Sequence, residues 1–323
     1  MLTKHTPQAK LTTVACFPDH SFLENLAVRA DGSILVTVLN RKELWCVPSP
    51  TADLPAQPVL MHTFAQSPMC IVEAEPDIFY VGTSDIYASH VSYLNRIDMH
   101  GWTPGMTVDS RVVLEFPEPR RALNGGCMIA PNVMLVADCF ASLIWRVDLP
   151  ADSAKVTARP WLKHDSMDYY PGSMKPEQPG VNGVRYASRT NYLYYTSTAK
   201  KLFMRVRVDP DTHDPAGEPE FVAGGGMFDD FCIDEDSGVA YVTTHRENTI
   251  DCVSLETNGN SDMRHSVAGE PLNEQLLGPS SGVWGRGPGE YGRVAYFTTD
   301  GGTTAPPPDG IVRPAKVLRV EFG

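Results

Sequence analysis

Long apolar runs are absent from this chain of 323 residues. No stretch approaches the roughly 20 apolar residues that a membrane-spanning helix needs, and the first twenty residues hold no apolar core of signal-peptide length. Cysteine is sparse, with seven residues and no Cys-x-x-Cys spacing, so we expect buried thiols rather than a disulfide framework. These absences predict a cytoplasmic protein without a membrane span.

Basic residues are also in deficit, with 27 Lys and Arg against 39 Asp and Glu, which gives a net charge of −12. The basic residues are scattered along the chain rather than clustered. Nucleic-acid binding depends on grouped Lys and Arg that release counterions from phosphates, so this class of partner is excluded. The partners that remain are small molecules, and the oligomeric state stays open.

Helical periodicity is missing as well. Instead, a short apolar sequence typical of a β-strand, which we call the phrase, occurs six times. The copies close on apolar residues that lie 47 to 67 positions apart, a spacing typical of propeller blades. The closing residues are Val47, Ile97, Val147, Val206, Val253 and Val320. Two apolar stretches precede each phrase and a further strand follows it, except after the last copy.

The pattern predicts an all-β fold, a single six-bladed β-propeller of four-stranded blades over residues 1–323. Residues 1–10 are expected to form a flexible N-terminus. The last blade lacks a fourth strand of its own, and the stretch 11–17 has no other partner. Pairing it with 316–322 would close the ring and remove the exposed sheet edges.

Polar residues stand just before each expected innermost strand, where propeller geometry gathers them around one mouth of the central channel. They are Glu24, Ser67, Asn124, Asn182, Asp229 and Ser281. Two carboxylates and two amides offer hard oxygen ligands for Ca²⁺, Mg²⁺ or Mn²⁺. The carboxylates could instead serve as acid and base, or the polar groups could simply satisfy the strand ends.

These residues carry a resemblance to the SMP-30/gluconolactonase-like family of six-bladed propellers. The matching motifs are Glu24-Asn25-Leu26, Asn124-Gly125, Asn182-Gly183 and Asp229-Asp230, in order and one to a blade. The resemblance implies that Glu24, Asn182 and Asp229 hold a divalent cation and that Asn124 positions the substrate. The family's usual Asp-Gly is Asp229-Asp230 here, which leaves open which carboxylate faces the channel.

The first-blade sequence, Glu-Asn-Leu-Ala-Val-Arg followed by Asp-Gly and an Ile-Leu-Val-Thr strand, resembles a branch of this family from fungal secondary metabolism. That branch includes hetero-Diels–Alder cyclases of tropolone–sesquiterpenoid pathways. The resemblance implies that a tropolone quinone methide is joined to a humulene-type alkene in a dihydropyran ring, and that the cycloaddition requires no cofactor.

Loops on the face of the polar ring supply further candidate residues for the active site. The connections after the second strands bring Tyr87, His245, Arg246 and Asp300 toward the mouth, and the segment 164–180 is expected to form a lid. Candidates for proton transfer are Glu24, Asp229 and His245, with Arg246 or Tyr170 polarising the tropolone oxygens. The substrate-binding candidates are Asn124, Ser67, Ser281, Tyr87, Met167, Tyr169 and Tyr170.

Two other functions fit the same pattern. A metal-dependent lactonase would use a cation at Glu24, Asn182 and Asp229 to polarise a lactone carbonyl and activate water. A non-catalytic binding propeller would instead use its outer rim to hold a protein partner. Because propellers host unrelated functions, fold alone does not choose among the three.

Overall fold

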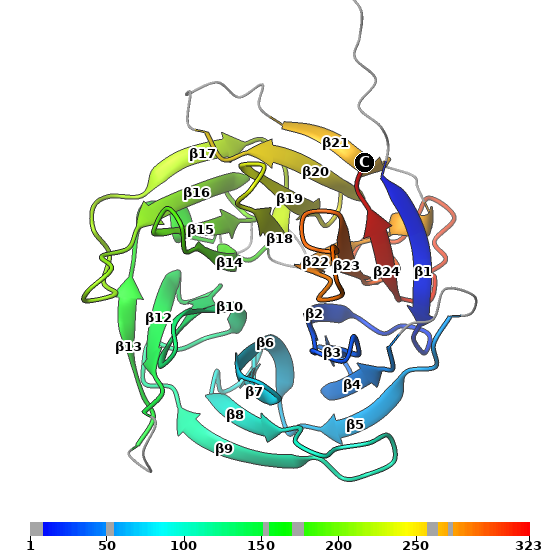
Figure 1. Ribbon diagram of the computed structural model, residues 1–323, viewed down its shortest axis with the longest axis horizontal. Coiled ribbons are helices and arrows are strands. Elements are labelled where there is room, and N and C mark those ends of the chain that lie inside the picture. Colours follow the sequence, from blue (N-terminus) through cyan, green and yellow to red (C-terminus); the bar gives the residue numbers. More distant parts are fainter. Residues whose placement is uncertain (1–8, 50–54, 151–154, 170–177, 257–263, 271–273) are drawn as a thin grey trace, which may run out of the picture.

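Six four-stranded antiparallel sheets stand around a central axis in the computed structural model of the chain (Figure 1). The structure describes residues 9–49, 55–150, 155–169, 178–256, 264–270 and 274–323. The predicted all-β, six-bladed propeller is confirmed. The described part contains only two short 3₁₀ turns, Asp165–Met167 and Glu274–Leu276.

Every blade has the same order of strands from the axis outward. The innermost strands are β2 (Leu23–Val28), β6 (Ser67–Glu75), β10 (Leu123–Ala130), β14 (Val181–Ala187), β18 (Phe228–Asp234) and β22 (Pro279–Trp284). The second strands are β3 (Ile34–Val38), β7 (Ile78–Ser84), β11 (Val133–Asp138), β15 (Tyr192–Ser197), β19 (Val239–Thr244) and β23 (Val294–Thr299). The third are β4 (Glu43–Val47), β8 (Ser92–Asp98), β12 (Leu143–Asp148), β16 (Leu202–Arg207), β20 (Thr249–Ser254) and β24 (Lys316–Glu321). The outermost are β5 (Val59–Thr63), β9 (Asp109–Glu115), β13 (Thr157–Leu162), β17 (Glu220–Gly224), β21 (Arg264–Gly269) and β1 (Lys10–Cys16). We number the blades 1 to 6 from β2 to β22.

The N-terminal strand closes blade 6, as the sequence predicts. β1 pairs with β24 in antiparallel register, with Leu11 opposite Val320 and Ala15 opposite Val317. Ala9 already donates a backbone hydrogen bond to Val267, and Lys10 begins the strand. Lys10, which the sequence assigned to a flexible N-terminus, therefore belongs to a strand, and residues 1–8 lie outside the described residues.

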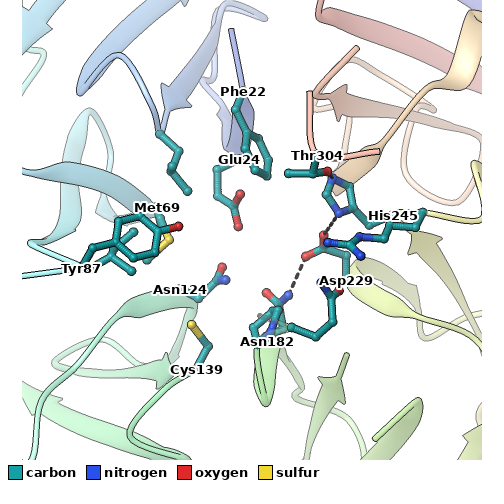
Figure 2. Close-up of a pocket in the computed structure, with 15 residues that line it drawn as sticks. Phe22, Glu24, Met69, Tyr87, Asn124, Cys139, Asn182, Asp229, His245 and Thr304 are labelled. Atoms are coloured by element: carbon teal, nitrogen blue, oxygen red, sulfur yellow. Dashed lines mark hydrogen bonds and ion pairs between the residues drawn. The ribbon is translucent and has the colours of Figure 1, made fainter. Parts of the chain in front are cut away.

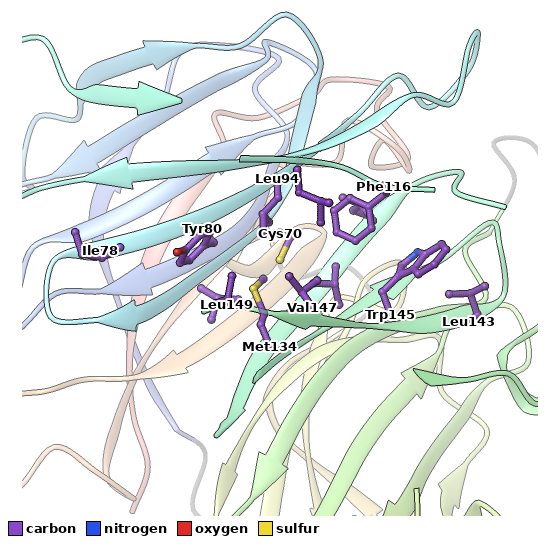
Figure 3. Close-up of a cluster of buried hydrophobic side chains, with 14 residues drawn as sticks. Cys70, Ile78, Tyr80, Leu94, Phe116, Met134, Leu143, Trp145, Val147 and Leu149 are labelled. Carbon is purple, nitrogen blue, oxygen red and sulfur yellow. The ribbon is translucent and has the colours of Figure 1, made fainter. Parts of the chain in front are cut away.

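The hydrophobic core lies between neighbouring blades. Between blades 2 and 3, Trp145 packs edge-on against Phe116 at 5.8 Å, and Cys70 and Met134 are fully buried beside them (Figure 3). Burying each large apolar side chain stabilises the fold by roughly 1.5–3 kcal/mol. Since each such cluster draws on two adjacent sheets, the blades hold one another in place around the ring.

The cysteines and the helices bear on two expectations from the composition. All seven cysteines are free thiols, as expected, but only four of them are buried: Cys127 and Cys252 are partly exposed and Cys16 is exposed. No helix in the described residues is long and apolar enough to cross a membrane.

A candidate active site at the channel mouth

A threonine in the second strand fixes the start of the innermost strand in four blades. Thr37, Thr196, Thr243 and Thr298 each accept a hydrogen bond from a backbone N–H of the innermost strand in their own blade. Each also donates to a backbone carbonyl of the next blade. The carbonyls that accept belong to Met69, Asp229, Ser280 and Glu24. This repeated contact defines equivalent ring positions.

The ring positions differ from the sequence prediction in two blades. Glu24, Asn124, Asn182 and Asp229 are each the second residue of their strand. In blade 2 the position belongs to Met69, and in blade 6 to Ser280. Ser67 and Ser281 do not line the pocket. The register shifts near the start of all six innermost strands, so this bulge is common to the blades. Ser281 lies one residue after the ring position of blade 6, and Ser67 lies two residues before that of blade 2.

A pocket opens at this mouth of the channel (Figure 2). Its lining comprises Phe22, Glu24, Leu39, Met69, Ile86, Tyr87, Asn124, Cys139, Gln178, Pro179, Asn182, Asp229, His245, Arg246 and Thr304. The cavity measures about 100 Å³, below the roughly 300–1,000 Å³ of sites that bury a whole drug-sized ligand. The cavity within the described residues therefore has room for only part of a ligand of that size.

Carboxylates and one histidine form a buried chain along one side of the pocket. Asp229 Oδ1 accepts a 2.7 Å hydrogen bond from Asn182 Nδ2, and its Oδ2 lies 3.8 Å from His245 Nδ1. His245 Nε2 lies 3.3 Å from Oδ2 of Asp300, which is fully buried. Phe22 stacks on the imidazole at 5.5 Å. These contacts hold His245 between two carboxylates.

The pKa values of this chain are moved by burial and by neighbouring charges. Burial, reinforced by the charge of Asp229, raises the pKa of Glu24 well above its usual 4.5. Burial also raises the pKa of Asp229 to about 7, although His245 opposes the change. Burial lowers the pKa of His245, but the charges of Asp300, Asp229 and Glu24 together outweigh it and raise the value to about 9. At neutral pH the pocket thus combines an imidazolium at His245 with a carboxyl at Glu24 whose raised pKa favours the neutral form.

The second carboxylate of the Asp229-Asp230 pair does not line the pocket. Asp230 Oδ2 accepts hydrogen bonds from Arg185 Nη2 at 2.6 Å and from Ser281 Oγ at 2.7 Å. A Cβ added to Gly183 would lie 2.2 Å from Asp230 Oδ1, so only glycine permits this approach of the strands. Asp230 therefore cross-links the strands of three blades, and Asp229 is the carboxylate that faces a ligand.

The loop candidates divide between the pocket and the core. Tyr87 and Arg246 line the pocket as expected. Met167 is fully buried among core residues and is not part of a lid. Tyr169 packs edge-on against Phe140 at 5.1 Å and does not line the pocket. Tyr170 lies outside the described residues.

Several residues that line the pocket are not indicated by the sequence pattern. Phe22 precedes β2, Cys139 follows β11, and Thr304 follows β23 in a loop anchored by Asp300. Asp300 accepts hydrogen bonds from the backbone N–H groups of Gly302 and Thr304. The ends of the second strands were expected at this face, but nothing in the sequence shows which of their residues turn inward.

The ring offers oxygen ligands suited to a hard cation. Glu24, Asn124, Asn182 and Asp229 point into the same space (Figure 2). The Oδ1 atoms of Asn124 and Asn182 are buried and find no hydrogen-bond partner within the described part of the chain. Among the described residues, no three His, Cys, Asp or Glu side chains are grouped closely enough to hold a metal ion. A divalent cation would therefore need the amide oxygens beside the two carboxylates, a donor set that Ca²⁺ accepts.

The raised pKa of Asp229 gives a testable pH dependence of stability. An acid with a raised folded-state pKa favours folding at low pH, and this contribution is lost as pH rises from about 4 to about 7. We expect Asp229→Asn to remove this loss and to raise Tm above that of the wild type by a few degrees at pH 8, with a much smaller gain at pH 4.5. Thermal unfolding with chelator present measures the difference. Asp236→Asn, at an exposed ion pair with Arg189, is the control that should change Tm little at either pH; an equal gain from both variants would contradict the assignment.

Several solved structures share the fold of this chain. No protein-family model and no curated protein matches the chain. A luciferin-regenerating enzyme aligns with a TM-score of 0.67 at 14% identity, covering 97% of this chain and 95% of that one. Regucalcin, a calcium-binding protein from Agrobacterium tumefaciens, gives 0.64 at 14% over 98% and 96%. A gluconolactonase from Xanthomonas campestris gives 0.65 at 10% over 98% and 90%. At these identities the likeness is one of fold.

Proposed function

We propose that this chain is a hetero-Diels–Alder cyclase that joins a tropolone quinone methide to a humulene-type alkene. The observation that carries the proposal is the divided lining of the pocket, where a buried carboxyl with a raised pKa and an imidazolium stand across from apolar side chains. The resemblance of the first-blade sequence to the fungal cyclase branch supports the same function. Neighbours named as a gluconolactonase and a luciferin-regenerating enzyme support an enzymatic role for the mouth.

The first step is loss of water from a hydroxymethyl tropolone. Glu24, whose raised pKa favours the protonated form, donates a proton to the hydroxyl group, the C–O bond breaks and water leaves. The carboxylate form of Asp229 accepts the proton of the tropolone hydroxyl, which leaves a neutral quinone methide. Solvent at the open mouth returns the proton from Asp229 to Glu24.

The second step is the cycloaddition itself. The quinone methide and the alkene form one C–C and one C–O bond, with no oxidation, no reduction and no leaving group. The protein contributes orientation, which lowers the barrier by up to several kcal/mol when the reacting atoms are held in contact. His245 and Arg246 place positive charge beside the tropolone oxygens and so favour the electrophilic form of the quinone methide.

Product analysis tests this function. Purified protein is incubated with a hydroxymethyl tropolone and humulene, and the adduct is resolved by chiral chromatography and mass spectrometry. A single stereoisomer formed faster than in the protein-free reaction supports the cyclase. A stereoisomer mixture formed at the protein-free rate would rule it out.

A metal-dependent lactonase is the second candidate, and the unpartnered amide oxygens of Asn124 and Asn182 favour it. Glu24, Asn124, Asn182 and Asp229 would hold the cation, which would polarise a lactone carbonyl. Lactone opening that needs Ca²⁺, Mg²⁺ or Mn²⁺ and stops with chelator would move the same residues to this function. The cyclase activity, by contrast, should survive chelation.

A further inference from the structure

Blade 2 interrupts the polar ring. Met69 occupies the ring position there, because Thr37 Oγ1 donates to its carbonyl at 3.2 Å in the same way that Thr298 Oγ1 donates to the carbonyl of Glu24. The Met69 side chain lines the pocket and is 3% exposed. The ring therefore presents a thioether to the ligand where blades 1, 3, 4 and 5 present a carboxyl or an amide.

Apolar side chains surround this methionine. Met69 clusters with Ile86 and Cys139, with Leu39 packed against them. Tyr87 is 84% exposed and lines the pocket as well. We call Leu39, Met69, Ile86 and Tyr87 the apolar wall. None of its four side chains carries a charge, whereas the opposite side of the pocket holds Asp229, His245 and Arg246.

We infer that the apolar wall is a subsite for an uncharged hydrocarbon and that Met69 determines its specificity. Apolar area removed from water here favours binding, while a hydroxyl group pressed on the same wall would lose its hydrogen bonds to water without replacement. The charged side takes the oxygenated end of the ligand, so the division fixes its orientation. The assignment of the hydrocarbon as the alkene partner of the cyclisation rests on the proposed function, but the apolar subsite does not.

Methyl NMR tests the subsite without any turnover. Protein labelled with ¹³C at the methionine methyl groups is titrated with humulene, and the Met69 signal is assigned by its loss in Met69→Leu. We expect the Met69 methyl signal to shift on addition of humulene and to stay in place on addition of glucono-δ-lactone. Met69→Gln, which keeps the side-chain length but adds an amide, should weaken humulene binding about tenfold, measured by isothermal titration calorimetry.

Two controls separate the wall from general stickiness. Met106→Gln alters a methionine that is 53% exposed between β8 and β9 and should leave binding unchanged. Met69→Leu keeps the wall apolar and should retain most of the affinity. A Met69 signal unmoved by humulene up to its solubility limit would overturn the inference. A shifted Met69 signal in a protein that forms no adduct would leave the subsite standing and remove the cyclase.

Discussion

Glu24→Gln should lower kcat for adduct formation from the hydroxymethyl tropolone by about 10²–10⁴-fold, the usual contribution of a general acid. Glutamine has the size of the glutamic acid but no transferable carboxyl proton. Glu24 is 5% exposed, and its burial together with the charge of Asp229 raises its pKa, which favours the neutral form that can donate a proton. Steady-state kinetics with mass-spectrometric detection measures the change, and Tm verifies that the fold persists.

The same variant also separates dehydration from cycloaddition. When the quinone methide is generated chemically in the assay, Glu24→Gln should keep most of the wild-type rate and stereoselectivity, because orientation no longer depends on proton donation. Glu75→Gln, at an exposed position at the far end of β6, is the matched control and should behave as wild type with either substrate. If Glu24→Gln is as slow with the preformed quinone methide as with the alcohol, Glu24 is not the acid of the first step.

The repeats in the sequence predict the architecture well because each blade repeats the same burial pattern. The β-branched second strands and the closing apolar residues locate most of the 24 strands, and the stretch without a partner at 11–17 identifies the closing strand. Burial of apolar faces between sheets is a repeated requirement, so it leaves a repeated signal. The four polar ring residues Glu24, Asn124, Asn182 and Asp229 follow from the same alignment.

The finer geometry of the site depends on features that do not repeat. The sequence does not show which residue of an innermost strand stands in the ring, where the structure places Ser280 and not Ser281, and Met69 and not Ser67. The contact of His245 with Asp300 joins residues 55 positions apart through loops of different length. Met167 illustrates the opposite error, since its apolar side chain serves the core and not a lid. Such contacts depend on how loops meet in the folded protein and produce no repeat in the sequence.

Closure of the ring gives the second large effect, in which Ala15→Glu should destabilise the protein by about 4 kcal/mol or more. Ala15 is completely buried opposite Val317, in a cluster with Phe17 and Val36. A carboxylate at this position would lose its hydration without gaining a partner, and the outermost strand of blade 6 would detach from β24. Urea unfolding followed by circular dichroism measures the loss, which is a large share of the roughly 5–15 kcal/mol that folded domains possess.

Cys16→Glu provides the matched control because it introduces the same charge one residue further along the strand. Cys16 is exposed and pairs with Lys316, so a carboxylate there stays hydrated and faces a positive charge. Its unfolding midpoint should remain close to that of the wild type. If both variants lose the same stability, the loss reflects a general sensitivity to added charge and not the closure of the ring by β1. If only Ala15→Glu collapses, the N-terminal strand holds the ring closed and thereby keeps Glu24 of blade 1, whose carbonyl accepts from Thr298 of blade 6, in its place at the mouth.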